Sequence, residues 1–192
     1  MTQVTIIGAG VAGLCTAGVL LDRGARVHLI DRARQPGPQG CSWWAGGMLA
    51  PYCEGESAEE PVVRLGQQAA DWWAQHTTSL KRCGSLVVSP ARDTSDLTRF
   101  ARRTQSHKTL TATEVEALEP DLGDRFATGL FFENEAHLSP RTALAELWRG
   151  LVADGATFDQ READPDARAN DGLVIDCRGY HARADMPALR GV

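Results

Sequence analysis

Apolar residues at the start of the chain follow first a strand pattern and then a helix pattern. A short β-branched run at 4–7 reads as a buried parallel strand. Residues 11–23 then carry apolar side chains at helical spacing, and Gly24 follows where glycine commonly ends helices. A second apolar run at 27–30 ends at Asp31. The pattern therefore predicts a β-α-β unit within about thirty residues.

The rest of the chain predicts shorter elements separated by polar loops. A long amphipathic helix is expected to bury Leu65, Ala69, Trp72 and Trp73, and Thr113 with Glu116 forms a candidate capping box. Ser139-Pro140 is expected to open a helix. The expected helices cover 59–80, 94–105, 113–119 and 139–154, the strands 86–88, 128–133 and 173–176, and the loops 34–40 and 159–171.

The candidate chemistry lies between the first strand and the first helix. Residues 8–13 read Gly-Ala-Gly-Val-Ala-Gly, and Asp31 closes the next strand 18 positions after Gly13. In this fingerprint Gly8 allows a tight turn, Gly10 lets a pyrophosphate approach the backbone, and Gly13 lets the helix pack closely. The helix N-terminus attracts the phosphates, and Asp31 can accept hydrogen bonds from an adenosine ribose. The motif predicts a dinucleotide site and leaves NAD and FAD open.

Composition and charge exclude several other classes. The net charge is −5 and no basic cluster exceeds Arg102-Arg103, which argues against nucleic-acid binding. The five cysteines form no Cys-x-x-Cys pair and no zinc spacing, so we expect no metal and a reducing compartment. The N-terminus lacks the features of a signal peptide, and no run of about 18 apolar residues predicts a membrane span. These observations indicate a cytoplasmic protein.

The segment 41–51, Cys-Ser-Trp-Trp-Ala-Gly-Gly-Met-Leu-Ala-Pro, has neither strand nor helix periodicity. It resembles the FAD-dependent oxidases of the D-amino-acid oxidase superfamily, and within it the glycine oxidases of thiamine biosynthesis. Small residues there allow backbone N–H groups to reach the flavin. The likeness extends through 54–63, which leads into the long helix, the turn at 174–179 and the residues 189–192.

The resemblance implies a set of FAD contacts that includes and extends the glycine fingerprint. Cys41 stands where a hydroxyl residue or alanine is more usual, and Trp43-Trp44 replaces small residues. Residues 156–172 also look short for the adenine-contacting strand of relatives. The predicted cofactor-binding residues are Gly8, Gly10, Val11, Ala12, Gly13, Asp31, Arg32, Cys41, Ser42, Gly46, Gly47 and Met48.

The resemblance also implies an architecture. The expected fold is α/β, with a Rossmann-like FAD-binding domain of the glutathione-reductase type and part of an inserted α+β substrate domain. Residues 1–83 would begin the FAD-binding domain, 84–136 would form the partial substrate domain, and 137–192 would continue the FAD-binding domain. Members of the family are about twice as long, so the chain resembles their N-terminal half. We expect poor FAD retention and a tendency to pair with itself or with a C-terminal half.

The implied reaction is oxidative deamination of glycine or another small amino acid or amine. An imine and hydrogen peroxide would form with molecular oxygen as acceptor, in thiamine thiazole biosynthesis. Because the flavin accepts the hydride, no acid–base residue is required here, and no catalytic residue is assigned. His137 is interpreted as an exposed loop residue. The alternatives are another flavin-dependent amine dehydrogenase and a non-catalytic dinucleotide-binding module.

Overall fold

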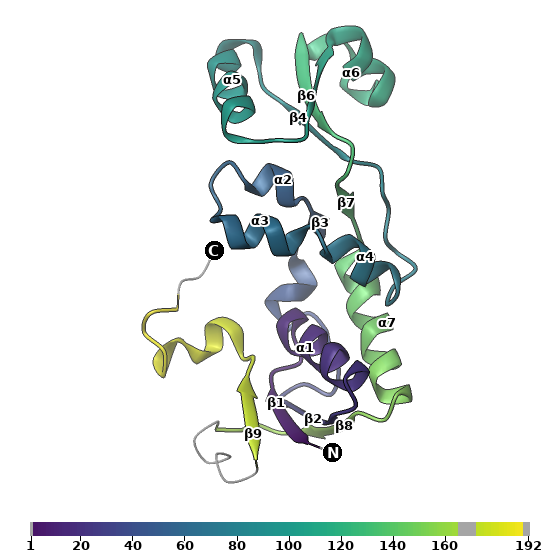
Figure 1. Cartoon of the computed structure of the whole chain (residues 1–192), viewed down its shortest axis with the longest axis vertical. Coiled ribbons are helices and arrows are strands. Elements are labelled where there is room, and N and C mark those ends of the chain that lie inside the picture. Colours follow the sequence, from purple (N-terminus) through teal and green to yellow (C-terminus); the bar gives the residue numbers. More distant parts are fainter. Residues whose placement is uncertain (1, 165–171, 190–192) are drawn as a thin grey trace. The chain divides into compact units, whose positions relative to one another are not determined.

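A computed structural model describes residues 2–164 and 172–189 of the chain (Figure 1). The residues group by their contacts into two compact units. Unit 1 comprises Met1–Gly46 and Ser139–Val192, and unit 2 comprises Gly47–Leu138. The predicted domain boundaries fell after residues 83 and 136, whereas the units divide after residues 46 and 138. The assignment of cofactor and substrate roles to domains stays a prediction.

Unit 1 is built on a four-stranded parallel sheet in the order β8-β2-β1-β9. When these four strands are numbered by their order along the chain, they lie side by side as 3-2-1-4, the arrangement of a dinucleotide-binding α/β fold. Figure 1 shows the two longer helices of the unit, α1 and α7, beside one another. The elements are β1 (Gln3–Ile7), α1 (Val11–Asp22), β2 (Arg26–Asp31), η1 (Cys41–Trp44), α7 (Pro140–Ala153), β8 (Thr157–Gln160), β9 (Leu173–Asp176) and η5 (Gly179–Ala184).

The centre of this sheet is apolar because parallel strands are covered by other elements on their faces. β1 pairs with β2 on one side, with Ile6 opposite Leu29, and with β9 on the other side. Ile6, Leu29 and Ile30 are at most 1% exposed, and Leu147 of α7 is 2% exposed. The predicted β-α-β unit and the strand at 173–176 are therefore confirmed.

The edge strand β8 corrects the expected loop, which began at residue 159. Its residues Thr-Phe-Asp-Gln lack an apolar run, so the sequence pattern did not reveal a strand. Cross-strand contacts with β2 stabilise it. His28 Nδ1 lies 2.9 Å from Thr157 Oγ1, and His28 Nε2 lies 3.4 Å from Asp159 Oδ2. Residues 165–171 of the predicted loop lie outside the described residues.

Unit 2 contains an antiparallel sheet in the order β4-β6-β5 and a two-stranded sheet of β3 and β7. Leu97, Leu130 and Phe132 form its buried cluster. β5 and β7 were not predicted, because neither has a clear apolar alternation. The elements are β3 (Met48–Leu49), α2 (Pro51–Glu54), α3 (Glu60–Gly66), α4 (Ala69–Ala74), β4 (Ser85–Val88), η2 (Ala91–Asp93), α5 (Thr94–Arg103), β5 (Lys108–Thr111), α6 (Ala112–Leu118), η3 (Pro120–Arg125), β6 (Thr128–Phe132) and β7 (Ala136–His137).

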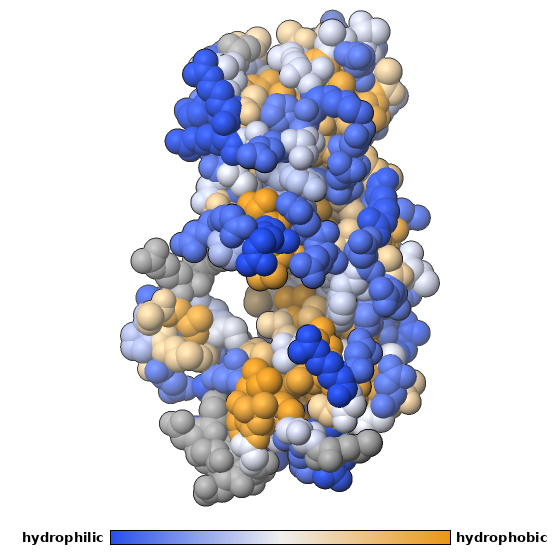
Figure 2. All heavy atoms as spheres, in the orientation of Figure 1, coloured by the Kyte–Doolittle hydropathy of each residue, from blue (hydrophilic) through white to orange (hydrophobic). Residues whose placement is uncertain are grey.

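The long helix predicted over 59–80 is wrong, because two short helices occupy that stretch. A turn separates α3 from α4, marked by the bond from the Gln68 N–H to the Leu65 carbonyl. The expected apolar stripe is therefore only partly buried. Trp73 is buried at 6% exposure, whereas Leu65 is 56% exposed. Other apolar side chains also interrupt the hydrophilic surface, as Figure 2 shows.

The cap of α6 lies two residues before the predicted one. The sequence contains Thr-x-x-Glu twice, from Thr111 to Glu114 and from Thr113 to Glu116. The structure uses the first: the Glu114 N–H donates to Thr111 Oγ1, and the Thr111 N–H donates to Glu114 Oε2 at 2.7 Å. Strand β5 ends at Thr111, so the helix begins at the next residue and Val115 becomes fully buried.

Within the described residues, no helix has both the length and the apolar character needed to cross a bilayer. The same residues also bring together no group of three or more histidine, cysteine or acidic side chains able to hold a metal ion.

Candidate cofactor site

The first glycine of the loop is required by the backbone of the chain itself. Gly8 has φ +106°, in the region that favours glycine. An added Cβ would lie 2.4 Å from the carbonyl oxygen of Cys177, in the turn after β9. The Gly8 N–H donates to the Ile30 carbonyl at 2.8 Å. This turn therefore joins three strands of unit 1 at the carboxyl end of the sheet.

The third glycine is required by close packing between helix and strand. A Cβ on Gly13 would lie 1.8 Å from the Gly8 carbonyl oxygen, a distance that no side chain can accommodate. Gly13 is buried in the first turn of α1. The structure thus shows the packing that the sequence fingerprint predicts for this position.

The second glycine has no comparable internal reason to be glycine. Gly10 has φ −76°, and the nearest atom to an added Cβ is Ser42 Oγ at 3.3 Å. Gly10 is the N-cap of α1, and the first turn of that helix carries no acidic side chain. The space and the helix polarity both suit a phosphate close to the backbone. The residues present therefore fit the pyrophosphate of a dinucleotide.

The segment η1 places Ser42 beside the first turn of α1. The Val11 N–H donates to Ser42 Oγ at 3.1 Å, so the hydroxyl hydrogen remains able to donate elsewhere. Arg141 of α7 lies over the Trp43 and Trp44 rings, 5.8 Å and 5.1 Å from their centroids. The two tryptophans that depart from the family pattern therefore help to fix η1, as cation–π contacts can.

Asp31 ties the end of β2 to the glycine loop. Its Oδ2 accepts the Ala9 N–H at 2.7 Å, and its Oδ1 accepts the Ala33 N–H at 2.8 Å. Each carboxylate oxygen retains a further acceptor site, so a ribose hydroxyl can still bind there. Arg32 is exposed, and its Nη2 lies 3.0 Å from His181 Nε2 in η5. Sequence reasoning missed His181, because no local pattern connects residues 149 positions apart.

The turn after β9 lies under the glycine loop. The Cys177 N–H donates to the Ile7 carbonyl at 2.7 Å. Arg178 Nη2 bonds Asp176 and Asp185, each at 2.8 Å. The hydrogen bonds from Arg178 hold the pKa of the Asp176 carboxyl below its usual value, because they favour its charged form. The family-like turn at 174–179 is therefore rigidly held, whereas residues 190–192 of the likeness lie outside the described residues.

The predicted site residues fall into both units. In unit 1 the loop residues, Asp31 and Ser42 are joined by the hydrogen bonds above, while Ala12, Cys41 and Gly46 are exposed. In unit 2, Gly47 has φ +79°, and Met48 pairs with His137 with 64% of its surface exposed. The expected contact of Gly46, Gly47 and Met48 with the flavin stays a prediction.

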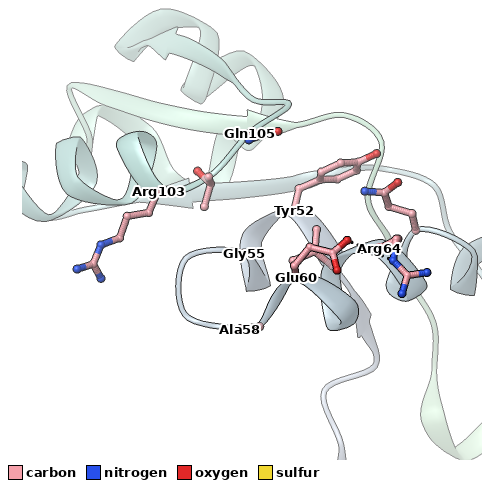
Figure 3. A pocket seen from close by; sticks show the side chains of 10 residues that line it. Tyr52, Gly55, Ala58, Glu60, Arg64, Arg103 and Gln105 are labelled. Atoms are coloured by element: carbon pink, nitrogen blue, oxygen red, sulfur yellow. Dashed lines mark ion pairs between the residues drawn. The ribbon is translucent and has the colours of Figure 1, made fainter.

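Unit 2 also has a depression of about 430 Å³ between α2, α3 and the end of α5 (Figure 3). Tyr52, Gln67 and Gln105 are among its lining residues. Arg64 and Arg103 lie on opposite sides of it in Figure 3, and each is paired with a glutamate. None of the lining residues belongs to the predicted cofactor site.

The parallel sheet and the glycine loop define a dinucleotide-binding α/β fold, and the family follows from comparison. The chain belongs to the DAO family, described as FAD dependent oxidoreductases, whose model matches residues 3–186. This membership confirms the predicted superfamily and fold class and indicates a flavin cofactor.

Two curated relatives align with nearly the whole chain. A Rhizobium etli protein named ThiO, assigned as a thiamine biosynthesis oxidoreductase, is 47% identical over 191 residues, which cover 99% of this chain and 58% of ThiO. The D-amino-acid oxidase of Streptomyces coelicolor is 29% identical over 189 residues, covering 96% of this chain and 54% of that enzyme. The chain thus spans just over half the length of these relatives.

Solved structures agree with the fold. Iminodiacetate oxidase from Chelativorans sp. BNC1 has a TM-score of 0.74 and 25% identity, covering 96% of this chain and 57% of that one. Glycine oxidase from Geobacillus kaustophilus has a TM-score of 0.72 and 21% identity, covering 95% of this chain and 57% of that one. The latter likeness supports the fold alone.

Proposed function

We propose that this chain binds FAD and belongs to an enzyme that oxidises glycine or another small amino acid or amine to an imine. Electrons would pass to molecular oxygen and yield hydrogen peroxide, in the formation of the thiamine thiazole. The observation that carries dinucleotide binding is the glycine loop, where no internal packing contact requires Gly10 to be glycine. The choice of FAD rests on the DAO family. The substrate class rests on the 47% identity with ThiO.

The residues of unit 1 have distinct parts in this proposal. Gly10 and Ser42 hold the pyrophosphate through a backbone N–H group and a hydroxyl, and Val11, whose N–H donates to Ser42 Oγ, orients that hydroxyl. Asp31 accepts hydrogen bonds from the ribose, and Arg32 lies beside it. When bound, FAD supplies the hydride acceptor, and the chain's own residues orient it and exclude water.

We place the protein in the cytoplasm as part of the same proposal. The five cysteines are free thiols in the structure. Free thiols suit a reducing compartment. Fractionation of the source cells would test this placement, and recovery only from an oxidising compartment would contradict it.

The first experiment measures cofactor binding. The purified full chain is titrated into FAD while the FAD fluorescence is followed, and NAD is offered as a competitor. We expect saturable one-to-one quenching by the chain that excess NAD does not reverse. Absence of FAD binding, or displacement of FAD by NAD, would overturn the cofactor part of the proposal.

The second experiment measures turnover by the FAD-loaded chain. Oxygen uptake and peroxide are followed with glycine, sarcosine and D-alanine. Peroxide formation from one of them supports the oxidase. Reduction of a quinone without oxygen uptake supports the dehydrogenase alternative. FAD binding with no substrate oxidised supports a non-catalytic module, and contradicts the enzymatic part of the proposal for this chain.

A further inference from the structure

A buried glutamate in unit 2 is not used by the proposed function. Glu135 lies between β6 and β7 and is 1% exposed. Burial of a carboxylate is costly unless its oxygens find donors. Oε1 accepts the Cys53 N–H at 2.8 Å, whereas Oε2 has no hydrogen-bond partner among the described residues. The backbone hydrogen bond from Cys53 therefore shows what the buried carboxylate contributes to the fold.

The bond of Glu135 replaces a cap that the local sequence cannot supply. The Cys53 N–H belongs to the first turn of α2, where backbone donors lack helical partners. Serine, threonine, asparagine or aspartate at the N-cap normally satisfies such a donor. The N-cap of α2 is Ala50, which has no side-chain acceptor and is 5% exposed. Glu135 therefore caps this turn from 82 residues away.

The backbone around Glu135 connects the same segment to the rest of unit 2. The Glu135 carbonyl accepts the Gly84 N–H at 3.1 Å. The strand that follows it pairs with β3, with Met48 opposite His137, and the Leu138 N–H donates to the Gly47 carbonyl at 2.9 Å. The segment 47–54 is thus held by its pairing at one end and by the Glu135 side chain at the other.

We propose that Glu135 is a positioning residue: its carboxylate fixes segment 47–54, which carries the predicted flavin contacts Gly47 and Met48. The second half of this statement rests on the proposed function, whereas the first half does not. The Cys53 thiol supports the contact, because burial and hydrogen bonding to Glu135 raise its pKa. The Cys53 thiol is thereby kept neutral, so it does not act as a reactive thiolate.

The test compares Glu135→Met with Glu135→Gln in the full chain. Methionine fills similar space without an acceptor, and glutamine retains an oxygen for the Cys53 N–H. Glu133→Gln is the matched control, because Glu133 lies two positions away, is exposed and pairs with Lys108. Removal of a buried carboxylate by an apolar residue need not unfold a protein, so the methionine variant is expected to fold.

Amide hydrogen exchange without added FAD tests the first half of the proposal. We expect Glu135→Met to accelerate exchange at Cys53 and in β3 by about ten-fold or more, while the β4-β6-β5 sheet keeps its protection. Glu135→Gln and Glu133→Gln should resemble the parent. Unchanged exchange in Glu135→Met, or equal loss in Glu135→Gln, would show that the acceptor does not position the segment. If Glu135→Met does not fold, Glu135→Leu, which also lacks an acceptor, takes its place and is compared with Glu135→Gln by the same criterion.

Visible absorption and circular dichroism of bound FAD test the second half. We expect Glu135→Met to alter the shape of the flavin bands, with rescue in Glu135→Gln. A normal flavin spectrum together with faster exchange would overturn the link to the cofactor. A parent chain that binds no FAD would count against the proposed function and this link, and the exchange data would still decide the role of Glu135.

Discussion

The three loop glycines differ in what requires them, although they look equivalent in the sequence. The chain's own backbone demands glycine at Gly8 and Gly13, where a Cβ would lie 2.4 Å and 1.8 Å from carbonyl oxygens. At Gly10 the nearest atom would be 3.3 Å away. A substitution at Gly8 or Gly13 should therefore lower stability, whereas a substitution at Gly10 should weaken ligand binding.

Gly10→Ala and Gly13→Ala test this difference, because both variants add one methyl group to the same loop. Gly13→Ala should lower the free energy of unfolding by about 3 kcal/mol, because the added methyl overpacks against backbone. Gly10→Ala should leave the urea midpoint nearly unchanged and weaken FAD binding about 10- to 100-fold, because the added methyl group occupies space through which the pyrophosphate approaches the backbone. Urea unfolding and FAD titration of both variants check this. Equal FAD affinity in Gly10→Ala and the parent would mean that the phosphate lies elsewhere.

Asp176 illustrates a second effect at this scale, a dependence of stability on pH. Its hydrogen bonds from Arg178 lower its pKa in the folded state. The stabilisation is therefore present above the unfolded value of about 3.9 and is lost as pH falls through the lower folded value. Urea unfolding should show Asp176→Asn less stable than the parent at pH 7, with the difference shrinking below about pH 4. A difference that does not shrink as the pH falls below about 4, or that matches the exposed control Asp22→Asn, would contradict this account.

At the scale of the element, competing local signals decide where helices begin and end. Thr111 and Thr113 each stand three residues before a glutamate, and only the end of β5 selects the first pair. Similarly, the apolar stripe of 59–80 suggests one helix, and the turn between α3 and α4 divides it. Periodicity identifies the type of an element more securely than its ends.

The capping register can be measured with two isosteric variants. Thr111→Val removes the hydroxyl that accepts the Glu114 N–H, and should lower the free energy of unfolding by about 1 kcal/mol. Thr113→Val lies on the exposed surface of the same helix and should change it by less than about 0.5 kcal/mol. Urea unfolding followed by far-UV circular dichroism compares them. A larger loss in Thr113→Val would place the cap where the sequence alone suggested it.

At the scale of the molecule, cofactor and stability should be linked. A ligand that binds only the folded state stabilises it by RT ln(1 + [L]/Kd), about 2.7 kcal/mol at a concentration 100-fold above Kd. The thermal midpoint of the full chain should therefore rise continuously with FAD concentration. Calorimetry with and without FAD checks this, and Gly10→Ala should show a reduced rise. A midpoint independent of FAD would be incompatible with the proposed site in unit 1.

Much of the cofactor half of the molecule could be predicted from the sequence, because its constraints are local. The strand and helix periods, the glycine spacing and Asp31 lie within about thirty residues, and they suffice for a β-α-β unit. The flavin class followed from the segment 41–51. No comparable local signal marks Glu135 or His181, whose partners Cys53 and Arg32 are 82 and 149 residues away.

The sequence by itself determined the dinucleotide fold and the glycine loop, because backbone sterics and side-chain periodicity act between near neighbours. The flavin was indicated by the resemblance of segment 41–51 to FAD-dependent oxidases. Only the tertiary structure decided that residues 157–160 form the edge strand β8, that Thr111 caps α6 and that Glu135 caps α2. Each depends on a partner that folding brings close, such as β2 for Thr157 or Glu135 for the Cys53 N–H. A polar residue's role is set by which donor or acceptor it meets, and the order of residues does not specify that meeting.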